Sequence, residues 1–185
     1  MYVGGVKGVG KTFVLREVFR QLSLEKVPFK KAKVAKVMFD LLKRYGMVEK
    51  YDELENISVE IKDCIRKESF KKILKDKNEN LIFDGHYSIS SQFGYEYGIP
   101  LNFIKEIDHL VLLYNNEDVV RRRRLEDKSK KRETSLEKVI IDLIIEEAFA
   151  EFYARLRGRK LKKIETNNKA SVSLKDFIKE VFESG

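Results

Sequence analysis

A glycine-rich segment at residues 5–12, with the sequence GVKGVGKT, limits this chain to a small set of folds. It fits the pattern Gly-x-x-x-x-Gly-Lys-Ser/Thr, in which glycines let successive backbone N–H groups turn inward around a phosphate. Lys11 can reach the outer phosphates as a point charge, and the hydroxyl of Thr12 suits a magnesium ion. The pattern predicts a nucleotide-phosphate loop that opens a helix, and a fortuitous glycine-rich turn is the weaker alternative.

The residues on either side determine how specific this pattern is, because a phosphate loop joins a strand to a helix. After the loop, apolar residues recur at helical spacing and form one face: Val14, Leu15, Val18, Phe19 and Leu22. Before the loop only residues 1–3 are available, whereas strands usually have about five residues. We therefore expect a helix after the loop and, before it, either an unusually short strand or a start that lies upstream.

Size and composition fit one globular domain spanning residues 1–185, with enough material for layers packed around a sheet. The single cysteine, Cys64, excludes an internal disulfide framework and fits a reducing cytoplasm. The chain shows neither a secretory leader nor an apolar run of about eighteen residues. We therefore expect a cytoplasmic protein without a membrane segment.

The formal net charge of +8 favours the binding of polyanions such as nucleotides, RNA or acidic membranes. Basic residues are interspersed with acids along most of the chain, however, and no recognition motif with interleaved aromatic residues occurs. A solvated, charged surface is the favoured interpretation, and nucleic acid is a less favoured partner.

A short apolar run at residues 81–84 ends at an acid, Asp84. This is typical of a buried parallel strand that delivers a carboxylate to the edge of a sheet. We interpret Asp84 as the Walker B acid, which would hold a magnesium-bound water or orient Thr12. A strand-terminal turn or a helix cap is the alternative for Asp84 taken alone.

Strands and helices alternate along the rest of the chain. Strands are expected near residues 30–34, at 110–114 and at 161–166, and helices at 35–44, 52–75 and 135–157. In the last helix, apolar residues recur about once per turn: Ile140, Ile144, Ala148, Phe152 and Leu156. This order predicts an α/β three-layer sandwich with a five-stranded parallel sheet, in which ligands gather at the carboxyl ends of the strands.

Four consecutive arginines at residues 121–124 open the densest positive segment, which continues with Lys128, Lys130, Lys131 and Arg132. Taken alone, such a run is most often a solvated helix face or an anion-binding patch. Here it follows a predicted central strand in a chain with a phosphate loop, and phosphoryl transfer needs cationic groups around the transferred phosphoryl. We interpret residues 121–134 as a basic lid that closes over a triphosphate.

The arrangement as a whole resembles the archaeal adenylate kinases and their nucleotide-kinase relatives. The matching segments are the loop at 5–12, Ile-Phe-Asp-Gly-His at 82–86, Gly94-Tyr95, Gly98-Ile99-Pro100, the strand at 110–114, the basic lid, the long helix, and the last strand leading into 166–168. They cover nearly the whole chain in order and spacing. The resemblance implies the P-loop NTPase fold, with a small helical region on the acceptor side at about residues 34–76 and a lid at about 121–134.

The resemblance also implies roles for individual residues. Donor ATP would bind to the loop and the start of its helix, at Gly5, Gly8, Val9, Gly10, Lys11, Thr12 and Phe13. Thr12 and Asp84 would serve magnesium, partly through water. Arg123, Lys130 and Arg132 would occupy lid positions that clamp phosphates, and Asn167 and Asn168 would pass the donor base. The implied catalytic residues are Lys11, Asp84, Arg123 and Arg132.

The acceptor side departs from the family, because Glu55 and Ser90 stand where archaeal adenylate kinases tend to have arginines, and Lys36 stands where they tend to have an acid. An arginine fork is the natural partner of a monophosphate, so its loss weakens the case for AMP as acceptor. Lys36 and its neighbouring lysines either bind a differently placed phosphate or solvate the surface. His86 either hydrogen-bonds an acceptor phosphate or Asp84, or serves as a packing residue.

These observations favour an ATP- and magnesium-dependent phosphotransferase of the nucleotide-kinase type, which transfers the γ-phosphoryl group of ATP to a small acceptor. A nucleotide is the favoured acceptor. The alternative is a regulatory or RNA-associated assembly factor that binds and hydrolyses ATP within a kinase-like fold. The expected partners are ATP, ADP and a small-molecule acceptor, and the sequence leaves the oligomeric state open.

Overall fold

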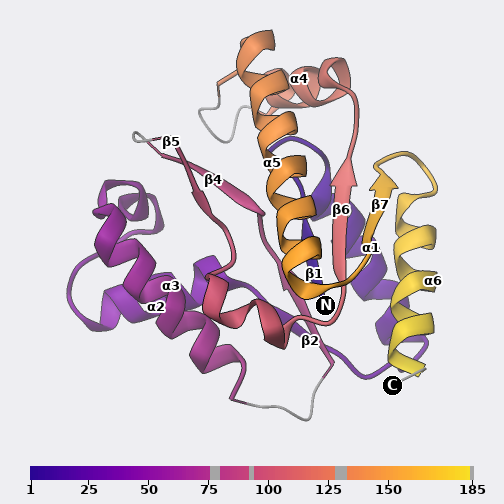
Figure 1. Cartoon of the computed structure of the whole chain (residues 1–185), viewed down its shortest axis with the longest axis horizontal. Helices are drawn as coiled ribbons and strands as arrows, with labels where there is room; N and C mark the ends of the chain where they lie inside the picture. Colours follow the sequence, from indigo (N-terminus) through magenta and orange to yellow (C-terminus); the bar gives the residue numbers. More distant parts are fainter. Residues whose placement is uncertain (76–79, 92–93, 128–132, 184–185) are drawn as a thin grey trace.

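A five-stranded parallel sheet lies at the centre of the computed structural model, which describes residues 1–75, 80–91, 94–127 and 133–183 (Figure 1). The strands in order across the sheet are β2 (Lys30–Ala32), β3 (Leu81–Asp84), β1 (Tyr2–Gly4), β6 (Leu110–Tyr114) and β7 (Leu161–Glu165). Every pairing in this sheet is parallel, as expected for strands joined by helical crossovers. The predicted five-stranded α/β sandwich is confirmed.

Strand β1 lies in the middle of the sheet although it has three residues. Tyr2 is level with Phe83 of β3 on one side and with Leu110 of β6 on the other. Val3 is fully buried and level with Asp84 at the end of β3. A strand that pairs on both sides and is buried on both faces is held in register despite its short length. This register places the start of the glycine-rich loop beside Asp84.

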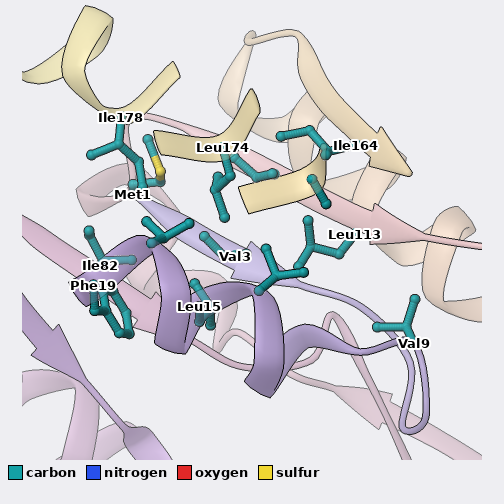
Figure 2. Packing of buried hydrophobic residues seen from close by; sticks show 14 of the residues in the cluster. Met1, Val3, Val9, Leu15, Phe19, Ile82, Leu113, Ile164, Leu174 and Ile178 are labelled. Atoms are coloured by element: carbon teal, nitrogen blue, oxygen red, sulfur yellow. The ribbon is translucent and has the colours of Figure 1, made fainter. Parts of the chain in front are cut away.

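Helices cover both faces of the sheet. α1 (Lys11–Leu24) and α6 (Ala170–Glu183) lie on one face, and α5 (Leu136–Arg157) lies on the other with the 3-10 helix η2 (Leu101–Glu106). Figure 2 shows the first face, where strand and helix side chains interdigitate: Val3, Leu15, Leu113, Ile164, Leu174 and Ile178. The loop at residues 5–10 connects β1 of the sheet to α1 on this face.

A small helical region lies to one side of the sheet and comprises α2 (Val34–Arg44), the 3-10 helix η1 (Tyr51–Asn56) and α3 (Val59–Ile73) (Figure 1). The helix expected over residues 52–75 is therefore two elements. The backbone of Ile57 is extended, and the Ser58 hydroxyl accepts a hydrogen bond from the N–H of Ile61, which caps α3. This local cap sets a boundary that apolar spacing does not reveal.

Several elements are not among the sequence predictions, including η2, α6, a hairpin and helix α4. Strands β4 (Ser88–Ser91) and β5 (Gly94–Tyr97) form an antiparallel hairpin that follows β3 closely. Helix α4 (Glu117–Glu126) contains the four arginines at 121–124, and the side chain of Asn116 caps its first turn. Of the predicted lid, residues 128–132 lie outside the described part of the chain.

Helix α5 carries apolar residues on two sides. Toward the sheet it buries Val139, Glu146, Ala150 and Tyr153. The apolar residues that mark this helix in the sequence lie on its outer side, where Ile140, Ile144, Phe152 and Leu156 are 37–60% exposed. A step of four residues advances about 40° around a helix of 3.6 residues per turn, so such a series drifts away from any single buried face.

Among the helices in the described ranges of the chain, none is both long enough and apolar enough to cross a membrane.

Replacing Leu174 by alanine should lower the free energy of unfolding by about 2–5 kcal/mol, because this side chain is fully buried between α6 and the sheet. Denaturant unfolding followed by circular dichroism measures the change. Val172→Ala on the same helix is the control, since Val172 is 48% exposed and its replacement should matter by less than about 0.5 kcal/mol. Equal losses in the two variants would contradict the packing of α6 on this face.

Candidate active site

The loop between β1 and α1 follows a backbone path that needs glycine at three places. Gly5, Gly8 and Gly10 have φ angles of 154°, 91° and 101°, a region that other residues rarely adopt. A Cβ at Gly5 would also lie 2.5 Å from the carbonyl oxygen of Leu113 in β6. The loop therefore lies close against the carboxyl end of the sheet, which is where parallel α/β sheets bind their ligands.

Lys11 and Asp84 meet at this end of the sheet. Lys11 is the first residue of α1, and Asp84 is the last residue of β3, the neighbour of β1. The Nζ of Lys11 donates to Oδ1 of Asp84 at 2.5 Å, and the two side chains are 11% and 21% exposed. Thr12 follows in the first turn of α1 and is exposed. The structure thus gathers the predicted phosphate lysine, the acid and the hydroxyl at one edge.

Arg123 of α4 connects the loop to the end of β7. Its guanidinium donates to the carbonyl oxygen of Val9 and to both oxygens of Thr166, at 3.0 Å for Oγ1 and 3.1 Å for the carbonyl. The hydroxyl of Thr166 in turn donates to the carbonyl oxygen of Val9 at 2.7 Å. Arg123 therefore holds the backbone of the loop, a contact that the prediction of a lid arginine did not include.

The other residues predicted on the donor side are Phe13, Lys130, Arg132, Asn167 and Asn168. Phe13 is 66% exposed at the start of α1. Asn167 and Asn168 are exposed in the turn after β7, and they follow Thr166, which contacts the loop, in the sequence. Lys130 and Arg132 lie outside the described residues.

Arg124, the next residue along α4, is buried and reaches the loop at a second point. Its Nε donates to the carbonyl oxygen of Lys7 at 2.8 Å, and its guanidinium pairs with Asp142 of α5 at 2.9 Å. Asp142 also accepts hydrogen bonds of 2.5 Å from Lys138 and from the hydroxyl of Tyr95. Burial alone would raise the pKa of Asp142, but these hydrogen bonds hold it below its usual range. A charged network thus joins α4, α5 and the hairpin to the loop.

Glu146 is a buried acid on the sheet-facing side of α5, with 2% of its surface exposed. Its carboxylate accepts hydrogen bonds of 2.8 Å from the N–H groups of Tyr87 and Ser88 and one of 2.6 Å from the hydroxyl of Ser88. Burial raises the pKa of Glu146, and these bonds, with one from the backbone of Gly5, oppose the rise. The acid therefore holds the segment after Asp84 in place relative to the loop.

His86 also faces the loop, with its Nδ1 2.6 Å from the carbonyl oxygen of Gly5. Because a carbonyl oxygen only accepts, this ring nitrogen carries the hydrogen. The other residue predicted on the acceptor side, Lys36, lies on α2, where its Nζ pairs with Asp40 at 3.1 Å. The side chain of Glu55 lies outside the description. The structure thus brings His86, and not Lys36, to the loop.

A pocket of about 180 Å³ opens beside the loop. Its lining comes from the loop, the segment after β3, the hairpin and α5, and includes Lys7, His86, Ser88, Ser90 and Lys138. The Nζ of Lys138 lies 3.3 Å from Oγ of Ser90. A lysine from α5 therefore stands beside Ser90, a position at which the family resemblance leads one to expect an arginine.

Sequence reasoning did not find Lys138, Asp142 and Glu146, which all lie on α5. A signal existed for Glu146, because it stands seven residues after Val139 and four before Ala150 and is in phase with the buried face of the helix. An acid in that phase indicates a buried partner. Lys138 and Asp142 gave only the signal of an ion pair four residues apart on one helix, since their other partners come from α4 and the hairpin, which are distant in the sequence.

Comparisons with known proteins agree with this geometry. Residues 4–141 match the family model described as an AAA domain. The chain is 32% identical over 168 residues to the adenylate kinase of Methanocaldococcus jannaschii, covering 89% of this chain and 88% of that protein. It is 32% identical over 181 residues to the adenylate kinase of Thermoplasma acidophilum, covering 96% and 95%. Shikimate kinase from Bacteroides thetaiotaomicron shares the fold, with a TM-score of 0.58 at 15% identity and coverage of 98% and 97%.

Glu146→Gln should lower the free energy of unfolding by about 1–3 kcal/mol, because the amide replaces an acceptor oxygen with an N–H₂ group that faces N–H donors. Turnover should fall as well, since the loop and the segment after Asp84 lose their common support. Glu147→Gln is the control, because Glu147 is exposed and pairs with Lys163 at the surface. Denaturant unfolding compares the variants, and a Glu146→Gln protein as stable as the control would refute the positioning role.

Proposed function

Since this chain belongs to the P-loop kinase family of the archaeal adenylate kinases, we propose that it transfers the γ-phosphoryl group of ATP to a nucleoside monophosphate. It is a P-loop phosphotransferase, and the names of its relatives point to a nucleotide as acceptor.

The observation that carries this proposal is the ion pair of Lys11 and Asp84 at the carboxyl edge of the sheet, next to the pocket. The Nζ of Lys11 is 2.5 Å from Asp84, and His86, two residues further on, lines the pocket. Donor phosphates held by the loop would end beside this pocket. The donor phosphate and the acceptor would then meet over the same edge of the sheet. Holding the two reacting groups in this geometry supplies much of the rate enhancement.

Thr12 and Asp84 are the residues that fit a magnesium ion, because both offer the oxygen ligands that this ion prefers. Within the described ranges, no group of three or more histidine, cysteine, aspartate or glutamate side chains could hold a metal without help. Such a site suits magnesium, which takes one or two protein oxygens and completes its shell with phosphates and water. When bound, magnesium would neutralise charge on the phosphate oxygens, and Lys11 would bind the outer phosphates.

The pocket suits the phosphate end of an acceptor. Lys7 and Lys138 supply positive charge, and Ser88 and Ser90 supply hydroxyl donors. Its volume of about 180 Å³ is below the roughly 300–1,000 Å³ of whole-ligand sites, so we assign the phosphate and part of the sugar to it. A phosphate acceptor is already ionised and needs no catalytic base, so positioning and charge stabilisation carry the reaction.

ADP formation from ATP and magnesium, measured against nucleoside monophosphates, nucleosides, small metabolites and RNA, tests the proposal. A monophosphate should accelerate turnover most. Lys11→Ala should keep its circular dichroism spectrum and lose at least about 100-fold in turnover, because it removes a donor to the transferring group. Lys160→Ala, in the exposed turn before β7, should retain full turnover.

Two outcomes would overturn this assignment. Unchanged turnover in Lys11→Ala would mean that the loop is not the active site. Turnover stimulated by RNA, with no response to any small acceptor, would favour the RNA-associated ATPase instead.

Lys138→Met should raise the KM for the monophosphate by about 10- to 100-fold, because a charge-assisted hydrogen bond contributes about 1.5–3 kcal/mol. The KM for ATP should change by less than about twofold, since the loop is intact. Lys36→Met is the matched control and should change neither constant, because Lys36 does not line the pocket. Steady-state kinetics would contradict the acceptor assignment if the two lysines exchanged these effects.

A further inference from the structure

Lys7 is the one exposed residue at positions 5–10 of the glycine-rich loop, all of which the structure describes. Val6 before it is buried, with 6% of its surface exposed, and Gly8 after it has a φ angle of 91°. The side chain of Lys7 lines the pocket beside the loop. A segment that is otherwise packed therefore presents one ammonium group to this pocket.

The backbone of Lys7 is held in place by α4. Nε of Arg124 donates to the carbonyl oxygen of Lys7 at 2.8 Å, and Arg124 is itself fixed by its pair with Asp142 at 2.9 Å. The contact with α4 is close, because a Cβ at Gly8 would lie 2.8 Å from Cγ of Arg124. A side chain that starts from such a fixed point has less freedom to lose when it binds a ligand.

The ammonium group of Lys7 has no ion pair or hydrogen bond within the described part of the chain. The other lysine and arginine side chains of the pocket lining are occupied, because Arg124 and Lys138 both pair with Asp142, at 2.9 and 2.5 Å. A phosphate can therefore reach Lys7 without breaking an existing pair.

The acids that line the pocket do not neutralise Lys7 either, because each of them has other partners. Asp142 holds the two cations just described. Glu146 accepts hydrogen bonds from two backbone N–H groups at 2.8 Å, and Glu133 does the same at 3.0 Å. The positive charge of Lys7 thus remains available for an anion that enters the pocket.

Lys7 belongs to two sites at once. Its backbone is part of the loop that, under the proposed function, holds the donor phosphates, and its side chain lines the pocket assigned to the acceptor phosphate. The γ-phosphoryl group has to pass from the first site to the second. Resting on that proposed function, we propose that Lys7 is a further catalytic residue, whose ammonium group stabilises the phosphoryl group during its transfer.

The chemistry of the transfer requires such a cation. A bond forms between the γ-phosphorus and an oxygen of the acceptor phosphate, while the bond to the bridging oxygen breaks and ADP leaves with the electron pair. Negative charge is spread over the outer oxygens of the group in transit. Lys7 donates hydrogen bonds to these oxygens and gives up no proton. It therefore acts as a cationic finger that the chain supplies from its own loop.

Replacing Lys7 by methionine removes the charge and keeps the side chain long. Lys7→Met should lower kcat by about 100-fold or more, because one donor to the developing charge contributes about 10²–10³ in kcat. The KM values for ATP and the monophosphate should change by less than about threefold, since the contact is made in the transition state. This result would differ from that of Lys138→Met, which is expected to act on the KM of the monophosphate.

Two further variants serve as controls. Lys7→Arg retains the charge and should keep at least about tenfold more turnover than Lys7→Met. Lys160→Met, in the exposed turn before β7, removes a lysine charge far from the loop and should leave kcat unchanged. Thermal unfolding of Lys7→Met should give the midpoint of the wild type, because its ammonium group has no partner in the described protein.

A transition-state analogue gives a readout without turnover. Aluminium fluoride bound beside ADP and magnesium takes the place of the transferred phosphoryl group. In titration calorimetry with AMP, CMP, GMP or UMP present, the wild type should bind ADP at least about tenfold more tightly when aluminium fluoride is added, as such analogues exceed substrates in affinity. Lys7→Met should bind ADP alone as the wild type does and should lose this gain.

The proposal is wrong if Lys7→Met keeps its kcat, if its loss appears in the KM for the monophosphate, or if it retains the tighter binding with aluminium fluoride. A Lys7→Arg protein as slow as Lys7→Met would also overturn it, since the charge would then not be what matters. Each of these results leaves the proposed function intact as long as Lys11→Ala is inactive. If no monophosphate is an acceptor, hydrolysis of ATP by water still tests Lys7, because Lys7→Met should slow it by a similar factor.

Discussion

The pairing of β1 with β3 and β6 is the constraint on which the carboxyl edge of the sheet depends. Three residues of β1 place the glycine-rich loop between two neighbours, and the register of Val3 with Asp84 brings the acid to the start of α1. A slip of one residue would move Asp84 by about 3.3 Å and turn its side chain to the opposite face. The burial of Val3 and its neighbours on both faces prevents that slip.

The loop itself is held by side chains that come from other elements. The carbonyl oxygens of Gly5, Lys7 and Val9 contact His86, Arg124 and Arg123, respectively. A buried backbone carbonyl must find a donor. Within the loop the N–H of Val9 donates to the carbonyl oxygen of Val6 at 3.2 Å, whereas these three carbonyl groups are served by side chains. Side chains from outside the loop thus hold its carbonyl groups at alternate residues, at positions 5, 7 and 9. Helix α4 and the segment after β3 thus share the task of shaping the loop.

The parts of this molecule that were predictable from sequence are those in which a local pattern has one physical meaning. The glycines at 5, 8 and 10 could be predicted to be functional because the backbone angles of such a loop exclude other residues. Asp84 could be predicted because an apolar run ends at it. The hairpin of β4 and β5 was not predictable, because its strands carry serines and, among the described residues, pair with each other alone.

Side-chain networks escaped prediction for a different reason. Asp142 gains its role from Arg124 and Tyr95, which reach it only after α4 and the hairpin have packed on α5. In α5 the apolar spacing identified the helix but could not tell its inner face from its outer one, because both are apolar.

The contact between Lys11 and Asp84 couples two equilibria. An ammonium that leaves the carboxylate for a phosphate uncovers a negative charge, and that charge then attracts a divalent cation more strongly. By thermodynamic reciprocity, a cation held at Asp84, as proposed, would release Lys11 and strengthen its hold on the nucleotide. With the ligands placed as proposed, each would therefore be a cooperative effector of the other, and the complex of both would be favoured over either one bound alone.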